Sequence, residues 1–292
     1  MRTTGETEEE TTSPAAPAPV RRRRGTAVLG RLAIVVAVVA VAAGGVWLVT
    51  KASAPVASPT TTDIPALQVK AADVQPGSVV PVSAVVAGGD QPTAPQQAEK
   101  QQPKPGDKNP LATWAGQVAA ATGIPARALR AYGNAELALR ANQPACKISW
   151  ATLAGIGRIE SNHGQYGGAV LQENGLPSKP IIGVPLDGSP GVAAINEGDS
   201  PAHAMGPMQF IPGTWRKWAS DGNGDGLGDP QQIDDAALTA ARYLCAGGRD
   251  MASPAGWWAG ILSYNNSTEY AQKVFGLADG YAKAAQAAKG RA

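Results

Sequence analysis

Apolar residues recur at helical spacing in seven stretches of the chain after residue 110. This pattern predicts helices over residues 111–121, 125–140, 149–162, 212–219, 234–245, 254–264 and 269–289. After position 100, no run of alternating polar and apolar residues is long enough to predict a strand. The fold class indicated is therefore mostly α with one core. A long Gly- and Pro-rich segment, 164–205, interrupts the helices, and we expect it either to be functional, as a lid or cleft wall, or to be partly disordered.

The first 50 residues show a different pattern. Residues 1–31 begin with an acidic, Pro-rich run and are predicted to be a disordered cytoplasmic tail. Residues 32–50 are uncharged and almost wholly apolar, about the length of a helix that spans a bilayer. Because Arg21–Arg24 and Arg31 precede this stretch, we expect an uncleaved, single-pass transmembrane signal anchor with the N-terminus inside. A cleavable signal peptide with secretion is the alternative, since Ala52-Ser53-Ala54 resembles a cleavage site.

Two further regions complete the predicted organisation. Residues 51–109 are rich in Pro and Ala and keep no sustained period, which indicates an extracytoplasmic linker. Residues 110–290 are the predicted folded domain, with 14 Lys and Arg against 14 Asp and Glu from residue 109 onward. A domain of balanced charge has no basic surface for phosphate backbones, so we expect no nucleic-acid partner.

The two cysteines both lie in the predicted domain. Cys146 and Cys245 most simply pair with each other if the domain is exported. Two buried free thiols are the alternative, favoured if the domain is cytosolic.

One acidic residue lies where the helical pattern expects an apolar one. Leu153, Ile156 and Glu160 share one face of the predicted helix 149–162, and Glu160 lies in its last turn. Desolvation and the negative end of the helix dipole would both raise the pKa of this carboxyl, so that it could donate a proton near neutral pH. The alternative is a carboxylate paired with an arginine elsewhere in the fold.

Three motif-like segments follow one another along the chain: Arg158-Ile159-Glu160-Ser161-Asn162-His163-Gly164, residues 204–215 (AMGPMQFIPGTW) and Ser263-Tyr264-Asn265-Asn266. Together they resemble the lytic transglycosylases, lysozyme-like enzymes that cut bacterial peptidoglycan. The second segment is most similar to the membrane-bound lytic transglycosylase B branch. The resemblance covers about residues 110–284 and implies a lysozyme-like helical domain of the soluble lytic transglycosylase and goose-lysozyme type, with long loops.

The resemblance also implies an activity and its residues. Glu160 would be the sole catalytic carboxylate, cleaving the β-1,4 bond between N-acetylmuramic acid and N-acetylglucosamine and leaving 1,6-anhydro ends. No cofactor would be required for this chemistry. The implied substrate-binding residues are Ser161, Met208, Gln209, Phe210, Tyr264 and Asn265. For Ser161 a merely local hydrogen bond is the alternative, and for Phe210 core filling.

The sequence leaves two rival functions open. Glu173, Asp187, Glu197 or Asp199 could fold over the cleft and supply the second acid of a hydrolytic muramidase. Alternatively, the domain could be a non-catalytic cell-wall scaffold module. His163 and His203 have no metal-ligand spacing and are interpreted as ordinary polar residues.

The segment 221–229 matches the first half of an EF-hand calcium loop. Its expected ligands are Asp221, Asn223, Asp225, the backbone carbonyl of Leu227 and Asp229, but Gln232 stands where the bidentate Glu is expected. The sequence thus predicts a structural Ca²⁺ site, with an Asx/Gly turn without metal as the alternative. The expected partners are peptidoglycan strands, the membrane through the N-terminal helix, and cell-wall or secretion machinery.

Overall fold

The computed structural model describes residues 69–83, 85–86, 109–189 and 192–290. The predicted cytoplasmic tail and transmembrane anchor lie outside the described residues. None of the helices within these ranges combines the length and hydropathy that crossing a membrane requires.

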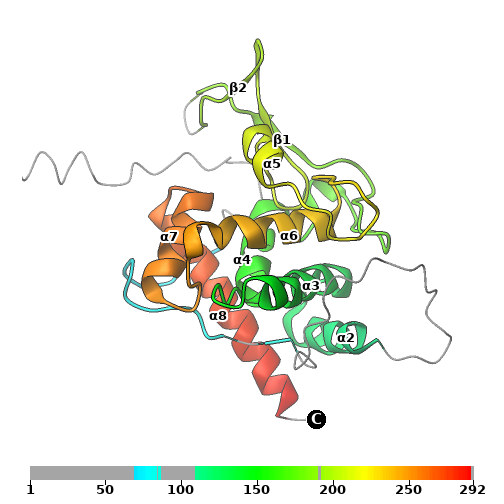
Figure 1. Cartoon of the computed structure of the whole chain (residues 1–292), viewed down its shortest axis with the longest axis vertical. Coiled ribbons are helices and arrows are strands. Elements are labelled where there is room, and N and C mark those ends of the chain that lie inside the picture. Colours follow the sequence, from blue (N-terminus) through cyan, green and yellow to red (C-terminus); the bar gives the residue numbers. More distant parts are fainter. Residues whose placement is uncertain (1–68, 84, 87–108, 190–191, 291–292) are drawn as a thin grey trace, which may run out of the picture. The chain divides into compact units, whose positions relative to one another are not determined.

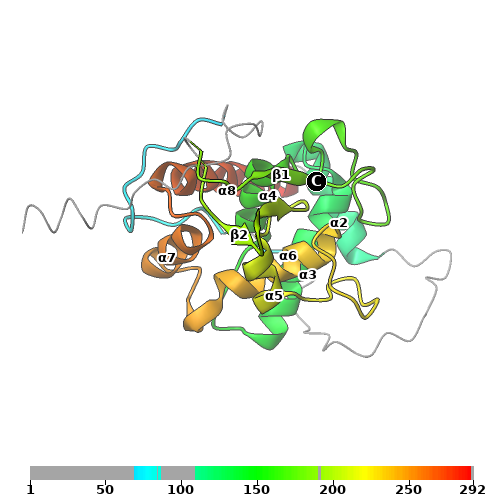
Figure 2. The same ribbon diagram turned by 90° about the horizontal axis from the view of Figure 1, so that it is seen from above.

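The described part of the chain forms a mostly helical domain (Figures 1 and 2). Each of the seven predicted helices is confirmed, with its ends within two residues of the prediction. Their bounds are α2 Pro110–Thr122, α3 Ala126–Asn142, α4 Trp150–Ser161, α5 Pro212–Trp218, α6 Ile233–Leu244, α7 Pro254–Tyr264 and α8 Thr268–Lys289.

Helix α4 is the centre of this domain. It begins at the Ser149 cap, whose hydroxyl accepts from the Thr152 amide, and ends at Asn162 in the left-handed conformation. Between these caps nearly every side chain is buried, because α4 packs against both α3 and α8. Gly155 lets the backbone of α8 approach at Val274, and Gly157 leaves room for the hydroxyl of Tyr132 on α3. The helix that carries Glu160 is therefore held firmly on two sides.

The long segment after α4 contains strands that the sequence did not predict. β1 (Ile182–Pro185) pairs antiparallel with β4 (His203–Met205), and β2 (Asn196–Glu197) pairs antiparallel with β3 (Ser200–Pro201). The hairpin of β2 lies beyond α5 at the top of Figure 1. The expectation of no strand was wrong because pieces of two to four residues are too short to show alternation.

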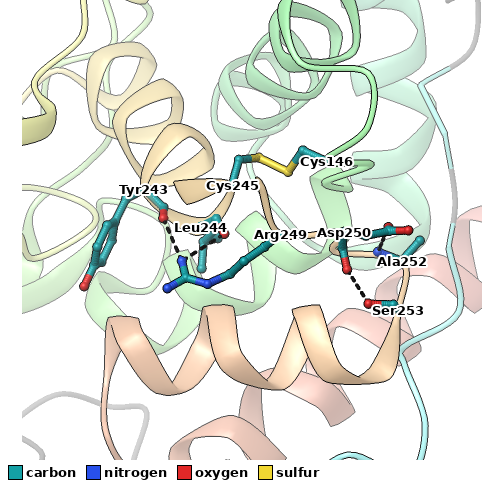
Figure 3. Close-up of a disulfide and its surroundings, with 8 residues drawn as sticks. All are labelled: Cys146, Tyr243, Leu244, Cys245, Arg249, Asp250, Ala252 and Ser253. Atoms are coloured by element: carbon teal, nitrogen blue, oxygen red, sulfur yellow. Dashed lines mark hydrogen bonds between the residues drawn. A yellow bond between two sulfur atoms is a disulfide. The ribbon is translucent and has the colours of Figure 1, made fainter. Parts of the chain in front are cut away.

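The predicted disulfide joins Cys146 to Cys245, 99 residues apart in the chain. It connects the segment before α4 to the C-terminal end of α6. Figure 3 shows Arg249 beside the bridge, donating to the carbonyl oxygens of Tyr243 and Leu244. The bridge holds the end of α6 close to the start of α4, and the Arg249 hydrogen bonds fix the turn that follows α6.

Part of the range assigned to the linker packs on the helices. Residues 69–83 and 85–86, which we call the strap, run beside α7 and α8 (cyan in Figures 1 and 2). Val86 is 2% exposed, and Ala72, Val74, Val80 and Val82 pack against the core. The boundary between linker and domain at residue 109 stays a prediction, but these residues are in contact with the folded unit.

Candidate active site

Glu160 lies in the last turn of α4 and is partly buried. Its Oε1 accepts a 2.5 Å hydrogen bond from the hydroxyl of Tyr270, in the first turn of α8. Burial raises the pKa of the Glu160 carboxyl from about 4.5 to about 7, while the Tyr270 hydrogen bond acts in the opposite direction. Since the described residues form no ion pair with Glu160, the alternative of an arginine partner has no support there.

The second motif forms a tight turn against the end of α4. Met205 and Phe210 exchange backbone hydrogen bonds of 2.9 and 3.0 Å, and residues 206–209 form the loop between them. Gly206 is required at this turn because its φ is +77° and a Cβ would lie 1.6 Å from the carbonyl oxygen of Pro230. The Ser161 hydroxyl donates to the Pro207 carbonyl at 2.6 Å, which ties the turn to the residue after Glu160.

The third motif reaches the same turn from α7. The Tyr264 hydroxyl donates to the Met208 carbonyl at 2.7 Å, and the Tyr264 ring packs edge-on against Phe210. Burial, and then the charge of Glu160, raises the pKa of Tyr264 well above its ordinary value. The structure thus brings together three motifs that lie up to a hundred residues apart.

The residues expected to bind substrate fall into two groups. Ser161, Met208 and Phe210 are buried, with exposures of 0%, 0% and 2%, and they brace the turn and fill the core. For Ser161 this fits the local alternative, because its oxygen also accepts from the Gly164 amide at 2.7 Å. The second group is Gln209 and Asn265, whose side chains have polar atoms available to other hydrogen-bond partners. Asn265 Oδ1 is buried and has no hydrogen-bond partner among the described residues.

Tyr270 is the site residue that the sequence reasoning missed. Burial and the charge of Glu160 raise its pKa well above the ordinary value, so it is a neutral donor at physiological pH. Its position is set by the Ser267 cap, whose hydroxyl accepts from the Tyr270 amide. The Ser267 N-cap, which places Tyr270 in the first turn of α8, could have been read from the sequence. The hydrogen bond from Tyr270 to Glu160 on α4 could not.

His163 helps to hold the end of α4 in place. Its ring nitrogens lie 3.2 Å from the Tyr132 hydroxyl and 3.4 Å from the Tyr281 hydroxyl. Burial, with a contribution from the positive charge of Arg158, lowers the pKa of His163 to about 3, so the imidazole is neutral. This neutral, buried ring links α3 and α8 to the end of α4. His203 donates from Nδ1 to the Gly183 carbonyl oxygen at 2.7 Å.

The calcium-like loop is held by its own backbone. Asp221 accepts from the amides of Gly224, Asp225 and Gly226, while Asp225 accepts from Leu227 and Asp229 accepts from Gln231. Buried Asp235, outside the expected ligand set, accepts from Gly222, Asn223 and Asp229.

These contacts direct the loop carboxylates to backbone amides. In the part of the chain that is described, no three or more His, Cys, Asp or Glu side chains gather closely enough to hold a metal ion. The Ca²⁺ site expected at Asp221, Asn223, Asp225, Leu227 and Asp229 stays a prediction, and the contacts above show how the loop is held by its own backbone amides.

The acids considered for a second catalytic role have other contacts. Glu173 pairs with Arg130, and Glu197 pairs with Arg216 on α5. Asp187 accepts from the Ser189 amide, and Asp199 is exposed at the tip beside β2. Within the described residues, none of these four acids forms a hydrogen bond or ion pair with Glu160.

A comparison with protein-family models matches residues 196–260 to the transglycosylase SLT domain. The matched region contains the turn with Gln209 and most of α7, but neither Glu160 nor the pair Tyr264 and Asn265. Searches among curated proteins and among solved structures found no match.

The described residues thus form a mostly helical domain, and residues 196–260 of the chain are similar to the transglycosylase SLT domain of the membrane-bound lytic transglycosylase B type. That region indicates peptidoglycan lytic transglycosylase activity and binding of peptidoglycan glycan strands.

Proposed function

We propose that this protein is a peptidoglycan lytic transglycosylase that cleaves the bond between N-acetylmuramic acid and N-acetylglucosamine and leaves 1,6-anhydro ends. One observation carries the proposal. Segments 158–164, 204–215 and 263–266 meet through the Ser161 and Tyr264 hydrogen bonds, next to a carboxyl whose pKa is about 7.

The reaction needs one group that acts first as an acid and then as a base. Protonated Glu160 donates its proton to the glycosidic oxygen as the bond from the muramoyl C1 to that oxygen breaks. The resulting carboxylate then takes the proton of the muramoyl 6-hydroxyl as O6 bonds to C1, so no water is consumed. A pKa near 7 suits both steps, because neither protonation state is strongly disfavoured near neutral pH.

The Tyr270 hydroxyl supports the second half of this cycle. It donates to Glu160 Oε1, and such a bond stabilises the carboxylate more than the neutral acid. The tyrosine thereby offsets part of the desolvation cost when Glu160 has given up its proton.

The remaining features of the proposal concern fold and location. We infer a lysozyme-like arrangement of the helices and a domain outside the membrane, held by an N-terminal anchor. The disulfide is consistent with an oxidising compartment outside the cytosol.

Product analysis tests the reaction type. Wild-type protein and the Glu160→Gln variant are incubated with purified peptidoglycan, and the released fragments are analysed by mass spectrometry. We expect anhydro-muramoyl ends from wild type and at least a hundredfold loss of release in the variant, which is of the order reported for removal of an acid–base catalyst. Reducing ends that contain added water would instead identify a hydrolytic muramidase.

A matched variant guards against a general effect of losing a carboxylate. Glu269→Gln removes an exposed acid on α8 that pairs with Lys273 and lies in the same turn as Tyr270. This variant should keep wild-type activity. Full biological activity of Glu160→Gln in the cell would favour the non-catalytic scaffold function.

A further inference from the structure

The carboxamide of Gln209 has a defined orientation. Its backbone is in the left-handed region, with φ of 47°, and the side chain turns back so that Nε2 donates to the Gly206 carbonyl at 2.9 Å. A flipped amide would place two oxygens against each other, so this contact fixes which end is which. The oxygen Oε1 is thus the end left to accept a hydrogen bond.

Gly183 on β1 lies directly against that oxygen. A Cβ built on Gly183 would be 2.6 Å from Gln209 Oε1, closer than such atoms can approach. The backbone of Gly183 is outside the left-handed region, so its conformation alone does not require glycine. What requires glycine is the space that the carboxamide oxygen occupies.

Strand β1 cannot easily retreat from this contact. The Ile181 carbonyl accepts from the Gly206 amide at 2.8 Å, and the Gly183 carbonyl accepts from His203 at 2.7 Å. The side chain of Gln231 also makes two hydrogen bonds to the backbone of Ile181. A side chain added at 183 would therefore displace the flexible end of Gln209 and leave the strand in position.

We propose that Gly183 is a positioning residue, which leaves room for the Gln209 carboxamide to present its oxygen to a donor on the glycan. The donors of matching chemistry are a sugar hydroxyl and the N–H of an acetamido group. The proposal rests on the proposed function for the identity of the ligand, whereas the contact between Gly183 and Gln209 is independent of it.

A double-mutant cycle in the full-length protein tests the coupling. Gly183→Ala should lower kcat/KM by roughly ten- to a hundredfold, since displacing a positioning group by about 1 Å has effects of that order. In a Gln209→Asn background the same change should cost less than twofold. Asn adopts positive φ readily and its shorter side chain does not reach Gly183. An equal loss in both backgrounds, or wild-type activity of Gly183→Ala, would overturn the proposal.

A control variant and a second readout distinguish a specific effect on Gln209 from a general loss of folding or activity. Gly116→Ala on α2 adds a Cβ that meets nothing within 4 Å, and it should keep wild-type activity. NMR of the side-chain amide of Gln209, assigned by its absence in Gln209→Asn, should shift in Gly183→Ala and stay unchanged in Gly116→Ala. An unshifted amide signal in Gly183→Ala would also refute the positioning role.

These readouts distinguish two kinds of failure. If wild-type protein releases no anhydro ends from peptidoglycan, the proposed function fails, and the amide signal still decides whether Gly183 orients Gln209. If wild type is active and the cycle shows no coupling, only the positioning role fails.

Discussion

At the scale of single residues, Glu160 is held where ionisation is costly. Its carboxyl is partly buried and has a pKa of about 7, compared with about 4.5 in an unfolded chain. A group whose folded-state pKa is raised contributes its full stability below pH 4.5, and that contribution is lost as the pH rises through 7. The raised pKa that suits Glu160 to acid–base chemistry therefore lowers the stability of the fold at alkaline pH.

Replacing Glu160 should consequently stabilise the protein at high pH. Glu160→Gln removes the ionisation and leaves an amide oxygen for Tyr270. We expect a gain of at most about 3 kcal/mol in unfolding free energy at pH 8, from a pKa difference of about 7 minus 4.5. Near pH 4 the two proteins should be almost equally stable. Thermal unfolding at both pH values checks this, and a gap in Tm that does not change with pH would contradict it.

Removing the Tyr270 hydroxyl should change the pH dependence of activity. In Tyr270→Phe, Glu160 loses the hydrogen bond that lowers its pKa, so the alkaline limb of the kcat/KM profile should move to higher pH. Turnover should fall roughly tenfold at neutral pH, because a hydrogen bond to a charged group is worth about 1.5 kcal/mol or more. Tyr243→Phe is the control, since that hydroxyl donates to the Ser263 carbonyl instead. An unmoved alkaline limb would show that Tyr270 does not tune Glu160.

At the scale of elements, local signals were sufficient to predict the helices. The spacing of apolar residues fixed their extent, and side chains such as Ser149 and Asn162 marked both ends of α4. The strands were missed because their pairing joins short pieces up to 23 residues apart, which no local pattern encodes. The same reason hid Tyr270, whose hydrogen bond to Glu160 spans 110 residues.

The site was predictable only in part for a related reason. Glu160, Gln209 and Tyr264 were expected from motifs that resemble a known family, and the structure brings their segments together. Residue type alone could not tell that Met208 is fully buried and contributes its backbone carbonyl. Burial depends on how the turn 206–209 packs against α4, which is a tertiary property.

The loop 221–229 gives a test of the calcium site predicted from the sequence. Its carboxylates accept backbone amides, and Asp235 on α6 accepts three more. A carboxylate that accepts an amide keeps lone pairs for a metal ion. If the loop binds Ca²⁺, we expect millimolar Ca²⁺ to raise Tm and a chelator to lower it. An unchanged Tm would instead favour the Asx/Gly turn without metal.

A positive control tests whether the contacts of Asp235 with the loop stabilise the fold. Asp235→Asn keeps the shape of the side chain but replaces one carboxylate oxygen by an amide donor that faces backbone N–H groups. Removing such a buried acceptor should lower the unfolding free energy by about 1–3 kcal/mol. This variant should melt earlier both with and without calcium.

At the scale of the whole molecule, the strap joins elements that are far apart in the sequence. The Trp258 indole on α7 donates to the Val79 carbonyl at 3.2 Å, and Asp279 on α8 accepts from the Val82 amide at 3.1 Å. At the end of the strap, Glu136 accepts from the Val86 amide and from the Trp150 amide, the first residue of α4. The strap thus contacts α7, α8 and the buried carboxyl of Glu136 at the start of α4.

Removal of the strap should therefore weaken the domain even though it lies within the predicted linker. A protein of residues 109–292 loses the amide partner that Val86 gives to buried Glu136 and exposes the apolar surface beneath Val80, Val82 and Val86. We expect its unfolding free energy to be lower than that of residues 69–292 by on the order of 3 kcal/mol. Trp258→Phe in the longer protein, which removes one strap hydrogen bond, should give a smaller loss in the same direction. Equal Tm values for the two lengths would mean that the domain begins after residue 109, because a strap that adds no stability is linker in the thermodynamic sense.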